Sequence, residues 1–443
     1  MADPRAMPDQ IEHILRTHDD AEVDNPNWRD QQTYGYIYRR GHVLTRQTDA
    51  VRAGRELNNY LRAYNGRNVD GWTQQDGNNP REPEPQIRVA RHLPGSQLLE
   101  FASGLDNARV QEPRIPQVLD QLDDTLGVGV VRPDHVLTAA SHACSATEPD
   151  TVPASFLPFP ELAADTCTCG HCTGEGVLVS VIDTGLVADA EKASPWLTDV
   201  DGDLDPYGEN GEILEYTGHG TFSAGCLRTI APKVEVYVER GVQHGGSGYE
   251  SELAVQFAEG LQRNPDIVIF CFAADTRKEL TLLGFDMVFD DYVAPTKGLT
   301  VLAPAGNEGN RKRKYPAASR SVIGVGALGT DWTKRADFTG FGGWVDVYAP
   351  GEDLINAFAT GTYECRWEPD KGTMRQFEGR AKWSGTSFST PIVAGMIAAR
   401  MSATGENSTE AAAVLLELAR ANRRREVGPI LLPGAGCPGP GLP

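Results

Sequence analysis

Three polar residues stand where they could carry out acyl-transfer chemistry: Asp183, His219 and Ser387. A serine hydroxyl becomes a nucleophile when a histidine takes its proton, and a buried aspartate can hold that histidine in the required tautomer. Asp183 ends an apolar run, where a carboxylate is costly unless it is paired. His219 lies between two glycines that leave its ring accessible, and Ser387 is expected to open a helix. Taken singly, each could instead be structural, as a turn cap, a packed histidine and a helix N-cap.

Asn307 adds a fourth chemical group. It follows a predicted strand and has glycine directly before it and again two residues later. An Asn side-chain N–H, together with the backbone N–H of Ser387, can stabilise the oxyanion of a tetrahedral intermediate. On its own the segment would equally fit a turn.

Together these four segments resemble the subtilisin-like serine proteases (subtilases), and the resemblance covers residues 176–425. The chain order Asp183, His219, Ser387 matches the Asp…His…Ser order of that family, which differs from the order in other triad enzymes. The resemblance implies that Ser387 is the nucleophile and His219 the general base. It also implies that Asp183 orients the histidine and that Asn307 contributes to the oxyanion hole.

The resemblance further implies a peptide or protein substrate, no required cofactor, and a substrate groove. The groove residues are expected to be Cys271, Phe272, Ala273, Ala305 and Gly306. The family commonly has a glycine where this chain has Ala273, so the groove is expected to differ in shape. Two other functions remain open. A peptide ligase or macrocyclase would use the same acyl-enzyme with an amine in place of water, and a binding protein would keep the fold without catalysis.

The elements that must position these residues alternate along the chain. From Gly176 to about residue 421, apolar runs alternate with helical patterns, and runs such as 267–273 and 299–303 favour strands buried on both faces. This alternation predicts an α/β fold with a doubly wound, mostly parallel sheet and helices on both faces. Functional residues are then expected beyond the carboxyl ends of the strands. Residues 361–381 look like an insertion and are expected to form a hairpin beside the cleft.

A small α+β domain is expected before this sheet, because two strand–helix passages occur between residues 31 and 140. By position it resembles the propeptide of subtilases, although a permanent regulatory domain is nearly as well supported. The expected organisation is a flexible arm (1–30), a prodomain-like module (31–144), a Pro/Cys-rich linker where maturation cleavage would occur (145–175), the catalytic domain (176–425) and a Gly/Pro-rich tail (426–443).

Composition narrows the function classes. The 443 residues carry a formal net charge of −20, which disfavours binding to nucleic acid or to anionic membranes. No apolar run approaches the ~20 residues of a membrane-spanning helix, and the first twenty residues lack the basic and apolar regions of a secretory signal. A cytoplasmic, reducing location is therefore the default expectation. The sequence leaves the oligomeric state open.

Three further clusters each have more than one reading. Asp201, Asp203 and Asp205 have calcium-like spacing, but an acidic surface loop fits them better because Pro206 stands where the calcium loop has glycine. The run Cys167–Cys172 could bind zinc, pair with Cys144, or hold free thiols. The basic run Arg311–Lys314 could attract acidic substrate residues, be a cleavage site, or be a solvated loop.

Overall fold

The fold is described from a computed structural model of the whole chain. The structure describes residues 6–31, 33–66, 87–93, 95–101, 113–139, 146–153, 155–159, 171–242 and 246–435.

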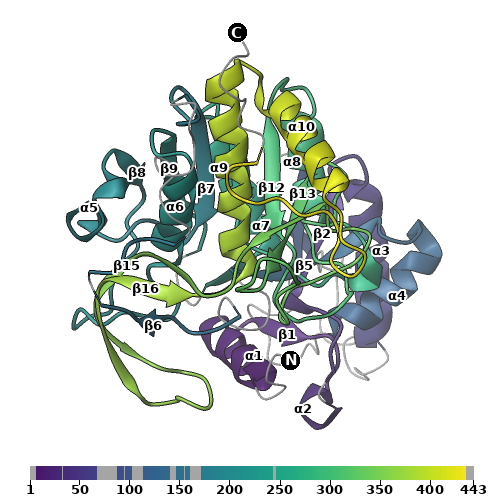
Figure 1. The fold of residues 1–443 in the computed structure, drawn as a ribbon. Coiled ribbons are helices and arrows are strands. Elements are labelled where there is room, and N and C mark those ends of the chain that lie inside the picture. Colours follow the sequence, from purple (N-terminus) through teal and green to yellow (C-terminus); the bar gives the residue numbers. More distant parts are fainter. Residues whose placement is uncertain are drawn as a thin grey trace.

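A seven-stranded sheet of parallel strands forms the centre of residues 176–425, the expected catalytic domain (Figure 1). Its order is β14-β13-β12-β11-β7-β9-β8. The strands are β7 (Leu178–Asp183), β8 (Val200–Gly202), β9 (Glu235–Arg240), β11 (Ile267–Phe270), β12 (Thr300–Pro304), β13 (Ile323–Leu328) and β14 (Val347–Pro350). All four side chains of β11 and all five of β12 are buried, as continuous apolar runs between two layers of helices require. The predicted doubly wound α/β fold is confirmed.

Helices cover both faces of this sheet. One face carries α6 (His219–Ile230), α9 (Thr386–Thr404) and α10 (Ser408–Ala421), and the other carries α7 (Glu250–Leu261) and α8 (Leu283–Val288) (Figure 1). The helix α9 is apolar on nearly every side and crosses β11 to β14, so it is a central core helix. Among the described residues no helix is long and apolar enough to cross a membrane.

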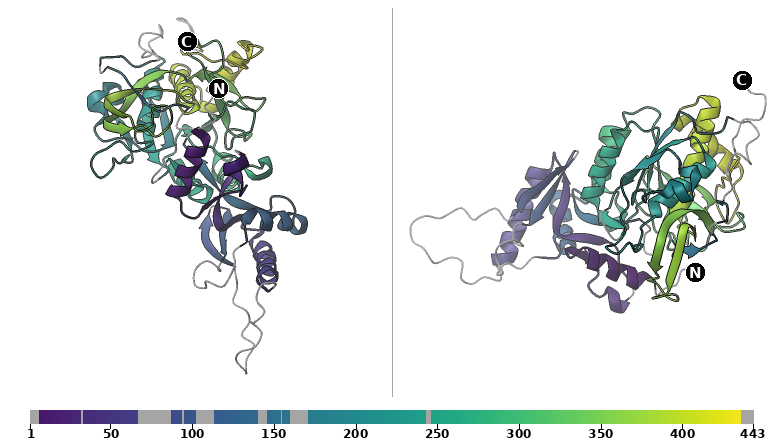
Figure 2. Two further views of the ribbon diagram at one scale, coloured as in Figure 1. Left: turned by 90° about the horizontal axis from the view of Figure 1, so that it is seen from below. Right: turned by 90° about the vertical axis from the view of Figure 1, so that its left-hand side faces the viewer.

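The N-terminal module (residues 31–144) forms a second sheet with two helices. Its elements are β2 (Ile37–Arg46), α3 (Ala50–Gly66), β3 (Ile87–Leu93), β4 (Ser96–Phe101), α4 (Ile115–Leu126) and β5 (Val131–Thr138). The sheet packs against α7 and α8 of the catalytic domain (Figure 2). Its edge strand β5 pairs with β10 (Ser247–Tyr249), so the catalytic domain supplies the outer strand of the module's sheet.

The expectation of a flexible arm at residues 1–30 is wrong for its described residues, which begin at residue 6. They form α1 (Ala6–Thr17), β1 (Ala21–Val23) and α2 (Trp28–Gln31). Ile11 and Ile14 of α1 are buried against Val136 and Tyr249, and β1 pairs with β2. The arm is ordered because its apolar face meets a surface that exists only when the module and the catalytic domain are together.

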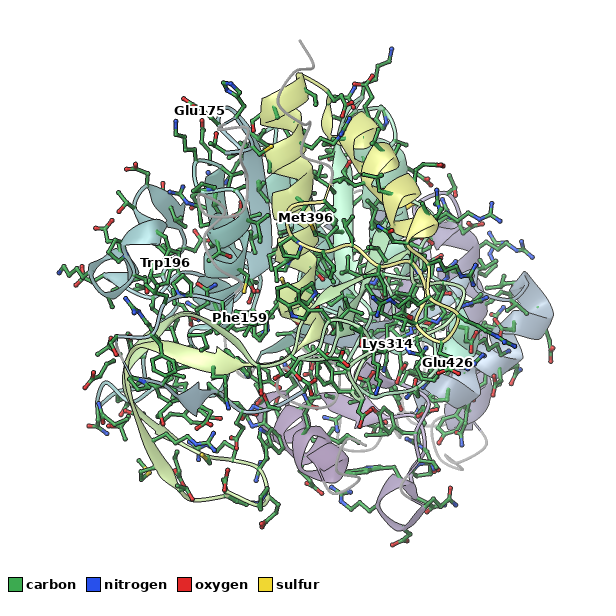
Figure 3. All side chains as sticks on the ribbon, viewed as in Figure 1. Phe159, Glu175, Trp196, Lys314, Met396 and Glu426 are labelled. Carbon is green, nitrogen blue, oxygen red and sulfur yellow. The ribbon has the colours of Figure 1, made fainter. Side chains whose placement is uncertain are left out.

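The expected linker and tail are also wrong in part. In the linker, β6 (Asp150–Thr151) pairs with β16 (Met374–Trp383), which forms the predicted hairpin with β15 (Leu354–Glu364). The Phe159 ring stacks 5.5 Å from the Trp332 ring, and Figure 3 labels Phe159. In the tail, Leu431 is buried and its N–H donates to Tyr348 O. Cys144, Cys167 and Cys169 lie outside the described residues.

Candidate active site

Asp183 and His219 form a buried, hydrogen-bonded pair. Asp183 is the last residue of β7, and His219 is the first residue of α6 after Gly218, whose φ of 91° needs a glycine. The carboxylate Oδ1 lies 2.7 Å from Nδ1 of the ring, and both side chains are 0% exposed. This contact leaves Nε2 of the histidine to face a nucleophile.

The Asp183 carboxylate is also held by two residues that the sequence analysis missed. Thr184 N–H donates to Oδ1 at 2.7 Å, and the Ser223 hydroxyl donates to Oδ2 at 3.0 Å. Burial alone would raise the pKa of Asp183, but the His219 ring, the Cys271 thiol and the N–H of Thr184 outweigh it, so its pKa lies below the usual value. The carboxylate therefore stays ionised beside the histidine.

Asp205 holds the turn that carries His219. Its Oδ2 accepts from Gly218 N–H at 2.7 Å and from the Thr184 hydroxyl at 2.9 Å. Burial raises the pKa of Asp205 to about 7.

The other two aspartates of the acidic motif point elsewhere, since Asp203 accepts from the hydroxyl of Tyr237 and Asp201 from the N–H of Gly202. The three carboxylates are not gathered, so the structure does not support the calcium expectation. In the part of the chain that the structure describes, no group of three or more His, Cys, Asp or Glu could hold a metal ion.

Ser387 lies in the first turn of α9, close to the histidine. The ring of the next residue, Phe388, is 5.1 Å from the His219 ring, and the Trp383 ring meets the same histidine edge-on at 5.5 Å. Two aromatic rings therefore pack against the His219 ring. The Ser387 hydroxyl donates to Ala139 O at 3.1 Å.

Asn307 is oriented by the start of the same helix. Its Oδ1 accepts from both the N–H and the hydroxyl of Thr386, at 3.0 and 2.9 Å. With its oxygen fixed, its Nδ2 must point away from Thr386, and this buried atom has no hydrogen-bond partner among the described residues. The same holds for Nε2 of His219. Buried polar atoms are rarely left unpaired, so both atoms mark a place prepared for another molecule.

A segment of the N-terminal module lies next to this place, at the Ser387 hydroxyl. Residues Val136–Ala139, here called the seated strand, lie between β10 on one side and Ala273 on the other. Thr138 exchanges two hydrogen bonds with Ala273, at 3.0 and 2.9 Å, and Ala139 N–H donates to Gly246 O at 2.7 Å. The seated strand is thus held between β10 and Ala273 by strand addition.

Among the described residues, Ala273 is the predicted groove residue that forms hydrogen bonds with the seated strand. Cys271 and Phe272 are buried in the core, and the Cys271 thiol lies against Asp183. Ala305 donates its N–H to Val325 O, and Gly306 O accepts from Gly340 N–H, so both support the Asn307 loop from behind. Of the three residues Cys271–Ala273, only the backbone of Ala273 lines the groove.

Comparison with known proteins gives consistent matches. The sequence model described as "Subtilase family" matches residues 174–428. The chain is 27% identical over 249 residues to a thermophilic serine proteinase of Bacillus sp. (strain AK1), covering 53% of this chain and 54% of that protein. It is 28% identical to subtilisin NAT of Bacillus subtilis subsp. natto, covering 51% of this chain and 55% of that protein. The chain thus spans about half the length of these relatives. A solved cold-adapted subtilisin-like serine proteinase overlaps with a TM-score of 0.44 at 22% identity, covering 59% of this chain and 90% of that one.

Proposed function

Since the chain belongs to the subtilase family, we propose that it is a serine endopeptidase that hydrolyses peptide bonds through an acyl-enzyme. Its substrate would be a peptide or protein that adds a strand between β10 and Ala273, as the seated strand does. The proposed chemistry uses groups of the chain alone, without a metal or another cofactor.

In the proposed mechanism the Ser387 oxygen attacks the carbonyl carbon while Nε2 of His219 takes the hydroxyl proton. Asp183 holds Nδ1 and stabilises the imidazolium that forms. The developing oxyanion receives hydrogen bonds from Nδ2 of Asn307 and from the N–H of Ser387. The imidazolium then protonates the leaving amine, the C–N bond breaks, and water repeats the sequence on the ester.

One observation carries this proposal: His219 Nε2 and Asn307 Nδ2 are buried and have no hydrogen-bond partner among the described residues, and they are the base and the oxyanion donor that the reaction needs. A structural role for either residue would favour satisfying that atom within the chain. The carbonyl of Ala139 beside the Ser387 hydroxyl supports the same assignment, because it places a peptide group at the nucleophile.

We also propose that the N-terminal module acts as a prodomain, with the seated strand blocking the cleft until cleavage. The contact between Ser387 and Ala139 favours cleavage next to Ala139 and not in the region 145–175 where the sequence led us to expect it. Described parts of that region are instead paired with the hairpin β15–β16.

The direct experiment incubates the full chain with an unlabelled peptide and determines product masses. Hydrolysis adds one water across the cut bond, whereas a ligase or macrocyclase would give a joined or cyclic product. Ser387→Ala should abolish product formation. The matched control is Ser389→Ala, since Ser389 is a buried serine one half-turn further along α9, and this variant should keep the activity. Equal activity in Ser387→Ala and the wild type would refute the proposal.

A further inference from the structure

A cavity of about 590 Å³ lies between the loop that joins β13 to β14 and the segment that follows α10. Its lining residues come from 333–341 and from 424–427, and Figure 3 labels one of them, Glu426. The volume is within the range of protein sites that bind small molecules. None of the residues proposed for catalysis lines it. This second site, here called the basic cavity, is therefore separate from the cleft.

The charges that line the basic cavity are mostly positive. Four lining side chains are basic and two, Asp337 and Glu426, are acidic. The whole chain has the opposite balance, with 61 acidic and 41 basic residues. Among the described residues, none of the four basic side chains forms an ion pair: Lys334, Arg335, Arg424 and Arg425. Like charges around one cavity repel one another, and an anion between them would offset that repulsion.

Both walls of the basic cavity are held by hydrogen bonds within the chain. On one wall the carboxylate of Asp331 accepts from the N–H groups of Thr333 and Lys334, at 2.7 and 3.1 Å. On the other wall Arg424 O accepts from the N–H of Val427 at 3.1 Å. The Arg424 guanidinium joins the two walls, since it donates to Thr333 O at 3.0 Å. The basic groups are thus placed before any ligand arrives, which lowers the entropic cost of binding.

The guanidinium of Arg335 is held by an aromatic ring. Its central carbon lies 4.0 Å from the centre of the Phe341 ring. Arg311, the first residue of the basic run singled out in the sequence, lies 5.2 Å from the centre of the same ring and adds positive charge nearby. A guanidinium stacked on a ring keeps its N–H donors at its edge, where they can bind an anion. Such planar donors match the paired oxygens of phosphate groups.

We propose that the basic cavity binds a phosphate ligand with more than one negative charge, whose diphosphate group lies between Arg335 and Arg424. Three guanidinium groups and one ammonium group line a space larger than one phosphate fills, so a diphosphate uses more of these donors than a single phosphate does. Free pyrophosphate and nucleotides share this chemistry, and the test separates the two sources. The inference does not depend on the proposed peptidase function.

The test measures binding by isothermal titration calorimetry to the full chain carrying Ser387→Ala, which stays intact, at constant ionic strength and without divalent cations. Pyrophosphate and ADP should each bind one site per chain with a Kd below about 100 µM, and sulfate at least about ten-fold more weakly. Tighter binding of ADP than of pyrophosphate would identify a nucleotide as the ligand, whereas equal binding would identify the free diphosphate.

Variants of the lining residues locate the bound anion. Arg335→Gln and Arg424→Gln should each weaken pyrophosphate binding about ten-fold, because each removes a charge-assisted donor. Glu426→Gln should strengthen it, because the carboxylate repels the anion. The matched control is Arg423→Gln, since Arg423 is an exposed arginine next to Arg424 that does not line the cavity, and its Kd should equal that of the parent chain.

Absence of binding by both diphosphates, sulfate that binds as tightly as pyrophosphate, or equal weakening by Arg423→Gln and Arg424→Gln would each overturn the inference. A peptide of four glutamates that binds more tightly than pyrophosphate would also overturn it, because the cavity would then be a docking surface for acidic protein segments. The Tm of each variant is measured first. If Arg335→Gln does not fold, Arg425→Gln replaces it, since Arg425 is exposed and lines the same cavity.

Discussion

At the scale of single residues, the site is recognised by buried polar atoms that have no hydrogen-bond partner among the described residues. Asp183 has three donors around it, whereas His219 and Asn307 each keep one buried atom without a partner. Asp183, His219, Asn307 and Ser387 were predicted as site residues because each lies in a short segment with its own chemical signature, and the structure shows the contact between Asp183 and His219. The residues that support them could not be predicted from the local sequence.

Ser223, Thr386 and Ala139 are those supporting residues, and local sequence gives no signal for them. Ser223 lies one turn after His219, and its role depends on where β7 ends. Thr386 reaches Asn307 across 79 positions, and Ala139 reaches Ser387 across 248. Such contacts exist only in the folded chain.

Asn307→Ala should lower kcat about 10²–10³-fold, the range known for removing one such donor from a subtilisin, with little change in KM. The reason is that Nδ2 meets negative charge that develops only in the transition state. Steady-state kinetics on one peptide measures both constants. Asn210→Ala, on an exposed loop, serves as control. A loss confined to KM would show that Asn307 binds substrate and does not stabilise the oxyanion.

At the scale of elements, the chemistry depends on where strands end and helices begin. Asp183 is the last residue of β7, and His219 is the first residue of α6. The N-termini of α6 and α9 adjoin, which brings two segments of distant sequence to one edge of the sheet (Figure 1). The apolar runs predicted these buried strands correctly, since strands between two helical layers need apolar side chains on both faces.

Gly218→Ala should reduce both stability and activity. Its φ is 91°, and a Cβ there would lie 2.8 Å from the Phe358 ring, so the start of α6 would have to move together with His219. We expect a loss of about 1–3 kcal/mol in the free energy of unfolding and a lower kcat. Thermal unfolding and kinetics measure the two effects.

Gly405→Ala is the matched control for that variant. Gly405 also has positive φ, 73°, at the end of α9, but a Cβ there meets nothing within 4 Å. It should lower stability by about 1 kcal/mol and leave kcat unchanged. If Gly218→Ala keeps full kcat, the placement of His219 does not depend on this glycine.

At the scale of the whole molecule, the N-terminal region and the catalytic domain share one surface. The described arm and module contact the catalytic domain at several places. For example, Gln10 bonds Tyr216, His18 bonds Ser247, and Asp134 accepts from the N–H and hydroxyl of Ser251. The composition could not predict this docking, since α1 is amphipathic whether or not a partner surface exists. The small α+β domain itself was predictable from its two strand–helix passages.

Asp134 should make this docking depend on pH. It is buried beside Ser251, Glu250 and Arg39, and burial raises its pKa to about 7. Because the folded pKa is above the value of 3.8 in the unfolded chain, its contribution to stability is complete below about pH 4. It is then lost as the pH rises through 7. The full chain should therefore be less stable at pH 8 than at pH 5.

Asp134→Asn should reduce this pH dependence by about 1–3 kcal/mol, since the amide does not titrate. Thermal unfolding at pH 5 and 8, in a Ser387→Ala background that prevents cleavage, measures it. The control is Asp124→Asn, because Asp124 is an exposed residue of α4. An unchanged difference between the two pH values would show that Asp134 does not titrate in this range.

The seated strand predicts where the chain cuts itself. Purified wild type should separate into two fragments at a bond next to Ala139, and Ser387→Ala should stay intact, because only the wild type has the nucleophile beside that carbonyl. Intact mass of both proteins over time gives the position. A cut within 146–175 would instead place the processing site in the Pro/Cys-rich linker, where the sequence analysis expects it.

The central claim, that Ser387 is a nucleophile activated by His219, is tested most directly by a fluorophosphonate probe. After self-cleavage stops, the wild type should take up one probe per chain, and peptide mapping should place it on Ser387. Ser387→Ala should take up none, His219→Ala far less, and Ser389→Ala as much as the wild type. Equal labelling of Ser387→Ala, or a wild type that cuts peptides yet carries the probe elsewhere, would contradict the account.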